Sequence, residues 1–339
     1  MKKFIFAFIV LLFIVSCGNN NETATTNDST ANTSTPADGK YTMVTVPKLR
    51  SAWFEDYENG AIKAAKDFGI ETYMQAPSSA DEAQQVRIIE DAVNQGVNAI
   101  LVVPNNAASC VPAFKRAQEK NILVLTHESP DQEGADYDVE MIDNVKFGER
   151  FIDELVAIVG DSGEYAIYVG SLTVPAHNIW ADAAIAYAKA KYPNLKMVGD
   201  KFPVSEDRNA ARQKTLELLT VYPNLKGILS FGSQGAPGAG QALREKSMQG
   251  KITILGTTTP KEIAPFLKDK SVTSSIMWSP GEASYAMVYL AKMILDGKRD
   301  EIKQGLEIPN LGVPTINGKN VLFNRPLVIT AENADNYNF

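Results

Sequence analysis

Cysteine, histidine and clusters of basic residues are scarce in this chain. Its 339 residues include two cysteines, Cys17 and Cys110, and two histidines. So few cysteines give no disulfide framework, and Cys110, in the helical stretch 107–118, is expected to be a small buried residue. The net charge is −7 and no basic cluster interrupts the sequence, which argues against a nucleic-acid partner.

No apolar run near the N-terminus is long enough to span a membrane. Lys2 and Lys3 precede a run of 12 apolar residues, 4–15, whereas a spanning helix needs about 20. The basic start, the short apolar core and the small residue Ser16 predict a secretory signal over residues 1–16. The Ile14-Val15-Ser16-Cys17 ending resembles a bacterial lipobox, which predicts that Cys17 is lipidated and becomes the mature N-terminus. The alternative is an ordinary secreted protein with a cysteine near its cleavage site.

Residues 17–40 are expected to form a tether rather than part of a core. After Cys17, this segment consists almost wholly of Asn, Thr, Ser, Ala and small acidic residues. Such a composition cannot bury enough apolar surface to offset the entropy of ordering, so it is typical of a flexible linker. The sequence therefore predicts a globular domain anchored by lipid outside the cytoplasm, on the periplasmic side or at the cell surface. Lipidated Cys17 would leave Cys110 without a disulfide partner.

Short apolar segments alternate with amphipathic helical stretches from Tyr41 onward. Continuous apolar runs such as 100–103 are typical of parallel strands covered on both faces. Alternating strands and helices predict the α/β class with doubly wound parallel sheets, and nine or more strands in about 300 residues favour two lobes. A repeated Tyr-Pro-Asn-Leu-Lys, at 192–196 and 222–226, is expected to separate a helix from the next strand. The expected strands are 41–46, 71–75, 99–103, 122–126, 165–170, 197–201, 227–231, 252–256 and 272–277.

The unusual side chains gather where the expected strands end, which is where ligands bind in open α/β sheets. Both histidines and all three tryptophans lie in these stretches. Aromatic faces beside amide, carboxylate and amine groups suit a polyhydroxylated ligand, although Phe54 and Trp180 also fit a purely packing role. The candidate ligand-binding residues are Lys48, Trp53, Phe54, Asn105, His127, Glu128, His177, Asn178, Trp180, Phe231, Ser233, Gln234, Thr258 and Trp278.

Enzymatic motifs are few. His127, Glu128 and His177 could serve as a metal or acid–base site, but neighbouring residues of an extended segment point in opposite directions. No Gly-x-Ser-x-Gly elbow is present. The glycine-rich segment 232–240 lacks the Lys-Ser/Thr of a phosphate-binding loop and is interpreted as a tight turn between strand and helix. No catalytic residue, metal or cofactor is therefore expected.

Five sequence blocks stand out together: Val46-Pro47-Lys48-Leu49, 94–100, Leu125-Thr126-His127-Glu128, Gly170-Ser171-Leu172-Thr173 and 335–339. With these blocks the chain resembles the type I periplasmic binding proteins over residues 41–339. The resemblance is greatest to the autoinducer-2 and rhamnose-type sugar-binding components of ABC transporters. It implies two Rossmann-like lobes joined by three crossovers, near 143–144, 257 and 298–301, with the ligand in the cleft between them. The lobes would comprise 41–142 plus 258–300 and 143–257 plus 301–339, and Asn144 at the first crossover joins the candidate site residues.

The autoinducer-2 binders of this family have ligand-binding residues that this chain retains only in part. Their lysine after the first strand matches Lys48, but their aspartate after the fourth strand falls on Glu128. Their Asp-Gln pair falls on Ala176-His177, and their Pro and Ala fall on Phe231 and Ser233. We therefore expect a ligand other than autoinducer-2, namely a monosaccharide or small sugar derivative. A neutral, an acidic and a phosphorylated sugar all remain open.

The resemblance implies a monomeric solute-binding lipoprotein of an ABC importer. Its partners would be the sugar, the permease (and through it the ATPase) and the membrane that holds the lipid. One alternative is a sensor that presents autoinducer-2 or a sugar to a chemoreceptor or histidine kinase, and another is a hydrolase acting on a sugar. A repressor's effector domain does not fit, because signal and tether stand where a DNA-binding helix-turn-helix would be needed.

Overall fold

Two seven-stranded sheets form the framework of the chain. The computed structural model describes residues 40–339, so the expected signal peptide, the lipidation site Cys17 and nearly all of the tether lie outside the described residues. Each sheet is mostly parallel, with antiparallel pairing only of β14 on β11 and of β12 on β13. The α/β class with two lobes is thereby confirmed. Each lobe consists of one sheet and the helices that cover it.

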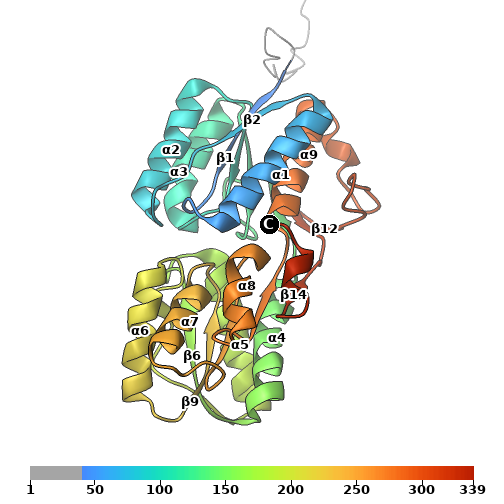
Figure 1. Cartoon of the computed structure of the whole chain (residues 1–339). Helices are drawn as coiled ribbons and strands as arrows, with labels where there is room; N and C mark the ends of the chain where they lie inside the picture. Colours follow the sequence, from blue (N-terminus) through green and yellow to red (C-terminus); the bar gives the residue numbers. More distant parts are fainter. Residues whose placement is uncertain (1–39) are drawn as a thin grey trace, which may run out of the picture. The chain divides into compact units, whose positions relative to one another are not determined.

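The first lobe is built on the sheet with strand order β12-β13-β5-β4-β3-β1-β2. Helices α2 and α3 pack together on one side of it, and α1 and α9 pack together on the other (Figure 1). The strands are β1 Thr42–Val46, β2 Glu71–Met74, β3 Ala99–Val102, β4 Leu123–His127, β5 Tyr137–Glu140, β12 Thr315–Asn317 and β13 Asn320–Leu322. The helices are α1 Ala52–Phe68, α2 Glu82–Gln95, α3 Ala107–Glu119 and α9 Pro280–Leu295.

The second lobe is built on the sheet with order β14-β11-β10-β9-β6-β7, to which β8 adds by pairing with β6. Helices α4 and α5 pack together, and α6 packs on α7 (Figure 1). The strands are β6 Ser162–Val169, β7 Asn194–Met197, β8 Phe202–Pro203, β9 Leu225–Ser230, β10 Thr253–Gly256, β11 Ser274–Met277 and β14 Leu327–Ile329. The helices are α4 Asn144–Val159, α5 Pro175–Lys191, α6 Arg208–Val221, α7 Gly235–Glu245 and α8 Pro260–Lys268, with short 3-10 turns at Arg299–Glu301 and Ala334–Asn336.

Side-chain caps fix where several helices begin, and with them the loops that follow the strands. Asp81 accepts a hydrogen bond from the Gln84 amide at the start of α2. Asp207 accepts from the amides of Asn209 and Ala210 at the start of α6. Each cap satisfies amide donors that have no partner within the first turn of the helix.

The lobe boundaries differ from those implied by the resemblance. The first crossover lies between β5 and α4, around Asp143. The second comes after β11 rather than near Thr257, because β11 pairs with β10 in the second sheet. The third lies between β13 and β14 rather than at 298–301, because β13 pairs with β5 in the first sheet. Residues 258–277 thus belong to the second lobe and 301–322 to the first.

The strands also differ from the sequence expectation in other ways, and the short strands β8, β12, β13 and β14 were not expected. The strand expected at 197–201 runs instead over Asn194–Met197, because Leu195 of the first Tyr-Pro-Asn-Leu-Lys copy is buried within it. Leu225 of the second copy begins β9 in the same way, so each repeat ends a helix and starts a strand. Strand β5 was not expected, because Tyr-Asp-Val-Glu places two carboxylates where a buried strand normally has apolar side chains.

Among residues 40–339, no helix is long and apolar enough to cross a membrane. Cys110 is fully buried in α3, as the sequence predicted. Burial raises the pKa of its thiol to about 12. The thiol therefore stays protonated at neutral pH and behaves as a small apolar group.

Helices α1 and α9 approach each other closely through two glycines, and this contact allows a stability prediction. A Cβ on Gly60 would lie 2.0 Å from the carbonyl oxygen of Gly281. Gly60→Ala should therefore lower the free energy of unfolding by about 1–3 kcal/mol, the cost of overpacking a filled interface. Urea unfolding would measure the change. Ile62→Ala, at a half-exposed position of the same helix, should change stability by no more than about 0.5 kcal/mol; equal effects of the two substitutions would contradict the packing argument.

Candidate functional site

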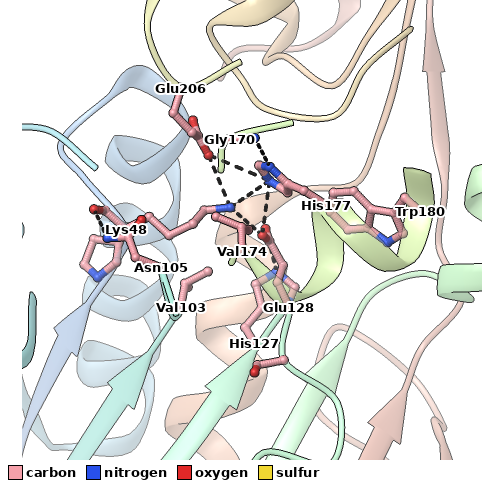
Figure 2. A network of polar contacts seen from close by, with 12 residues as sticks. Lys48, Val103, Asn105, His127, Glu128, Gly170, Val174, His177, Trp180 and Glu206 are labelled. Atoms are coloured by element: carbon pink, nitrogen blue, oxygen red, sulfur yellow. Dashed lines mark hydrogen bonds and ion pairs between the residues drawn. The ribbon is translucent and has the colours of Figure 1, made fainter. Parts of the chain in front are cut away.

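The candidate site centres on a buried ammonium group that contacts both lobes. Lys48 Nζ lies 2.7 Å from Glu128 Oε2 in the first lobe. In the second lobe it lies 3.3 Å from Glu206 Oε1 and 2.9 Å from His177 Nε2. Figure 2 shows the Lys48 side chain extended toward these three groups. All four side chains are at most 5% exposed, so this polar cluster is shielded from bulk solvent.

Lys48 is held by hydrogen bonds to the backbone just beyond β1. Asn105 Nδ2 donates to the Lys48 carbonyl oxygen at 2.7 Å. Buried Gln85 donates to the carbonyls of Pro47 and Val103 and accepts from the Asn105 amide at 2.8 Å. These bonds tie the ends of β1 and β3 together, so the base of the lysine is fixed. The side chain of Asn105, a candidate site residue, thus holds Lys48 in place by bonding the Lys48 backbone.

Glu128 reaches the cluster because its backbone is left-handed. Its φ is +59°, a region that residues other than glycine and asparagine rarely adopt. The expectation that His127 and Glu128 point in opposite directions is therefore wrong: His127 Nε2 lies 3.7 Å from Glu128 Oε1. An extended backbone at Glu128 would have separated them.

Both ring nitrogens of His127 make hydrogen bonds within the protein, so this residue supports an aromatic wall and not a metal or acid–base site. Its Nδ1 lies 2.6 Å from the Val139 carbonyl and must carry a hydrogen to donate to it. Its Nε2 then accepts from Trp278 Nε1 at 3.2 Å. Burial lowers the pKa of His127, which agrees with this neutral tautomer. The residue fixes the Trp278 ring, and no group of three or more possible metal ligands occurs in residues 40–339.

Aromatic rings enclose the polar cluster. Trp53 and Trp278 meet edge to face with centroids 5.2 Å apart, and the His177 ring stacks on Trp180 at 5.3 Å. Trp180 Nε1 donates to Asn144 Oδ1. These rings are anchored by their own hydrogen bonds and packing, so they form rigid walls. Phe54 and Phe231 complete the enclosure.

Glu206 is a residue of the candidate site that sequence reasoning missed, as is Thr257. Glu206 lies in the loop between β8 and α6, where Ser205-Glu206-Asp207 has the ordinary composition of a helix start. Gly170 makes room for it, because a Cβ there would lie 2.8 Å from Glu206 Cγ and 3.0 Å from His177 Nδ1. Glu206 thus brings a second carboxylate, besides that of Glu128, to the cavity.

Burial and mutual attraction set the charges in the cluster. Burial alone would lower the pKa of Lys48, but Glu128 and Glu206 outweigh it, so the pKa lies above its ordinary value. Burial lowers the pKa of His177 well below its ordinary value, and Lys48 adds to this effect. Burial raises the pKa of Glu206, as does the charge of Glu128, while Lys48 opposes them. At neutral pH, Lys48 is therefore charged and His177 is neutral.

The predicted site residues fall into two groups. Nine line a single inner cavity, together with Glu206 and Thr257. The other six lie around it: Asn105, His127 and Asn144 hold cavity residues as described, and Thr258 Oγ1 donates to the Ser233 carbonyl at 2.9 Å. Asn178 bonds the carbonyls of Ser171 and Val174, and Gln234 contacts Glu262 in an outer cleft. The nine are Lys48, Trp53, Phe54, Glu128, His177, Trp180, Phe231, Ser233 and Trp278.

The inner cavity is nearly filled by its own side chains. About 10 Å³ remains free, roughly the room that one water molecule needs. An outer cleft of about 560 Å³ is lined by both lobes and shares Glu206 with the inner cavity. Entry of any ligand larger than a water molecule into the inner cavity therefore requires the lining residues of the two lobes to separate.

Comparison with known proteins assigns the family. Residues 42–299 match the family model described as periplasmic binding protein domain, and the chain belongs to this family of binding proteins. Among curated relatives, the ribose import binding protein RbsB of Bacillus subtilis is 22% identical over 256 residues, which is 76% of this chain and 82% of the relative. The D-allose-binding periplasmic protein of Escherichia coli is 26% identical over 260 residues, 74% and 82% of the two chains.

Solved structures share the same two-lobed fold. LsrB from Clostridium saccharobutylicum in complex with AI-2 superposes with a TM-score of 0.80 at 25% identity, covering 88% of this chain and all (100%) of the other. An ABC transporter solute-binding protein from Clostridium phytofermentas with bound L-rhamnose superposes with a TM-score of 0.81 at 21% identity, covering 88% and 99%. The second likeness concerns the fold alone.

The neutral state of His127 predicts how stability depends on pH. The pKa of His127 is depressed in the folded chain, whereas in the unfolded chain it titrates near 6.5. The unfolded state therefore binds more protons below about pH 6.5, and the stability contributed by neutral His127 is lost as the pH falls. His127→Gln should be less stable at neutral pH but decline less steeply toward pH ~5.5, by up to ~1.4 kcal/mol per pH unit. Urea unfolding at several pH values would measure both slopes, and parallel slopes would contradict a neutral buried His127.

Proposed function

We propose that this protein is the solute-binding component of an ABC importer and binds a monosaccharide or small sugar derivative. The observation that carries the proposal is the cavity where Lys48 and Glu128 of one lobe meet His177 and Glu206 of the other. It lies beyond the carboxyl ends of β1 and β4, the usual ligand position in such sheets. The family and the ribose- and allose-binding relatives support the same assignment.

The chemistry of the cavity suits a sugar. Aromatic rings provide flat apolar surfaces for the C–H faces of a pyranose or furanose ring. Carboxylates and an ammonium group make charge-assisted hydrogen bonds to hydroxyls, each stronger than a bond between neutral groups. Aromatic residues and charged groups come from both lobes, so a ligand held among them would join the lobes.

Binding proceeds in this proposal by separation and closure of the lobes. The little free space in the inner cavity means that the ligand enters when the lobes part and replaces contacts that Lys48 makes with His177 and Glu206. Closure then buries the ligand and produces a surface that the permease recognises. The ligand shifts the equilibrium only by binding the closed form more tightly than the open one.

The ligand proposed here differs from autoinducer-2. Lys48 matches the family's lysine, but Glu128, Ala176, His177, Phe231 and Ser233 replace residues of the autoinducer-2 binders. Glu206 supplies a carboxylate in place of the aspartate missing at Ala176. Its longer side chain comes from another loop, so the hydroxyl that it contacts would have a different position on the ligand.

Glu128→Ala should weaken sugar binding by about tenfold or more, because a hydrogen bond to a charged group contributes about 1.5–3 kcal/mol. Thermal-shift screening of the purified protein against neutral monosaccharides would identify the ligand, and calorimetric titration would give both affinities. Glu58→Ala, at a surface position paired with Arg50, is the control and should bind normally. An unchanged affinity of Glu128→Ala would remove Glu128 from the site, and a ligand recovered chemically altered would contradict a transport function.

Anchoring through Cys17 is the second part of the proposal. Two or three acyl chains on this cysteine would hold the protein stably at a membrane, whereas a single chain gives only reversible binding. Cys17→Ser should move the protein from the membrane fraction to the soluble fraction and remove the acyl mass from its N-terminal peptide. Fractionation and mass spectrometry would measure this. An unmodified wild-type cysteine would contradict the anchor without affecting the assignment of the binding site.

A further inference from the structure

Two hydrogen-bond donors face each other in the candidate site. The Gly170 amide donates to His177 Nδ1 at 3.0 Å, so Nδ1 carries no hydrogen and the neutral ring carries its hydrogen on Nε2. That Nε2 lies 2.9 Å from Lys48 Nζ, an ammonium that can only donate. This contact lacks an acceptor. An oxygen atom placed between the two nitrogens could accept a hydrogen bond from each.

Two other buried oxygen atoms of the cavity lining have no hydrogen-bond partner, namely Glu206 Oε2 and Thr257 Oγ1. The other carboxylate oxygen of Glu206 lies 3.3 Å from Lys48 Nζ and 3.7 Å from His177 Nε2. A group that accepts from Lys48 and His177 and also donates to Glu206 would satisfy all three residues, and a hydroxyl group does both.

The charge balance disfavours an anionic ligand. Lys48 contributes one positive charge to the cluster, against two carboxylates, Glu128 and Glu206. Nearby arginines do not restore the balance, because Arg208 pairs with Glu262 and Arg50 lies 3.6 Å from Glu58. A phosphate or carboxylate on the ligand would meet this excess negative charge inside an enclosed cavity, where like charges repel by several kcal/mol.

We infer that the site selects an uncharged sugar over its acidic or phosphorylated counterparts, and that Glu206 and His177 both hydrogen-bond to the same ligand hydroxyl. His177 Nε2–H and Lys48 donate to the hydroxyl oxygen, and the hydroxyl hydrogen is donated to Glu206. The inference rests on the proposed function and narrows its ligand class. Glu206 becomes the residue that both binds the neutral ligand and rejects the anionic one.

Matched neutral and anionic sugars test the inference on the purified wild-type protein. The probes are D-ribose with D-ribose 5-phosphate, D-glucose with D-glucose 6-phosphate and D-glucuronate, and D-galactose with D-galacturonate. Calorimetric titration should show a neutral member binding at least about 100-fold tighter than its anionic counterparts. An anionic member that binds as well as its neutral counterpart, or better, would overturn the inference and leave sugar binding intact. Binding of none would contradict the proposed function itself, and the inference with it.

Glu206→Gln tests the role of the carboxylate. It keeps the shape of the side chain and removes one charge, so affinity for the neutral sugar should fall about tenfold or more. The ratio of neutral-sugar affinity to anionic-sugar affinity should fall by at least about tenfold beyond the loss of neutral-sugar affinity, because the anionic sugar no longer meets the Glu206 charge. Glu245→Gln is the matched control: it removes the same charge from the same lobe at a surface position paired with Arg212, and should leave both quantities unchanged. A preference unchanged in Glu206→Gln, or reduced equally in the control, would overturn the role of Glu206.

Discussion

The structure of the site depends on the burial of one ammonium group. Lys48 is almost completely removed from water, and an isolated charge in that position would be prohibitively unfavourable. Glu128 and Glu206 compensate it, and they belong to different lobes. The lysine therefore stays charged and buried only while both lobes are in place. The backbone bonds from Asn105 and the left-handed turn at Glu128 are the local arrangements that make this geometry possible.

The contacts that Lys48 makes with both lobes are polar, so they contribute little net free energy to holding the lobes together. Charged groups buried in an ion pair lose hydration that roughly offsets their mutual attraction, so their net contribution to closure is small. When the lobes part, water can hydrate Lys48, Glu128 and Glu206 again. An apolar contact of the same area would hold the lobes together far more strongly. A ligand that supplies the missing acceptor beside His177 and the missing donor beside Glu206 can therefore determine the equilibrium between open and closed lobes.

Much of the framework was predictable because buried parallel strands are continuous apolar runs, as residues 100–103 illustrate. The same rule fails for β5, where Asp138 and Glu140 are buried; burial raises the pKa of both carboxyl groups, that of Asp138 to about 6. Most cavity residues were predictable from their position after strands. Glu206 was not, because Ser-Glu-Asp before a helix is an ordinary capping sequence and only the fold brings it to Lys48. The crossover positions likewise depend on long-range strand pairing, which local sequence patterns do not encode.

Glu206 and Phe231 show how loop side chains shape the site on this framework. The loop before α6 brings the Glu206 carboxylate to Lys48, and Phe231, which follows β9, adds a large ring to the cavity lining. Both residues lie just outside the strands. Because the lobes and their crossovers position the loops independently of what the loops carry, specificity resides in a few side chains on a common fold.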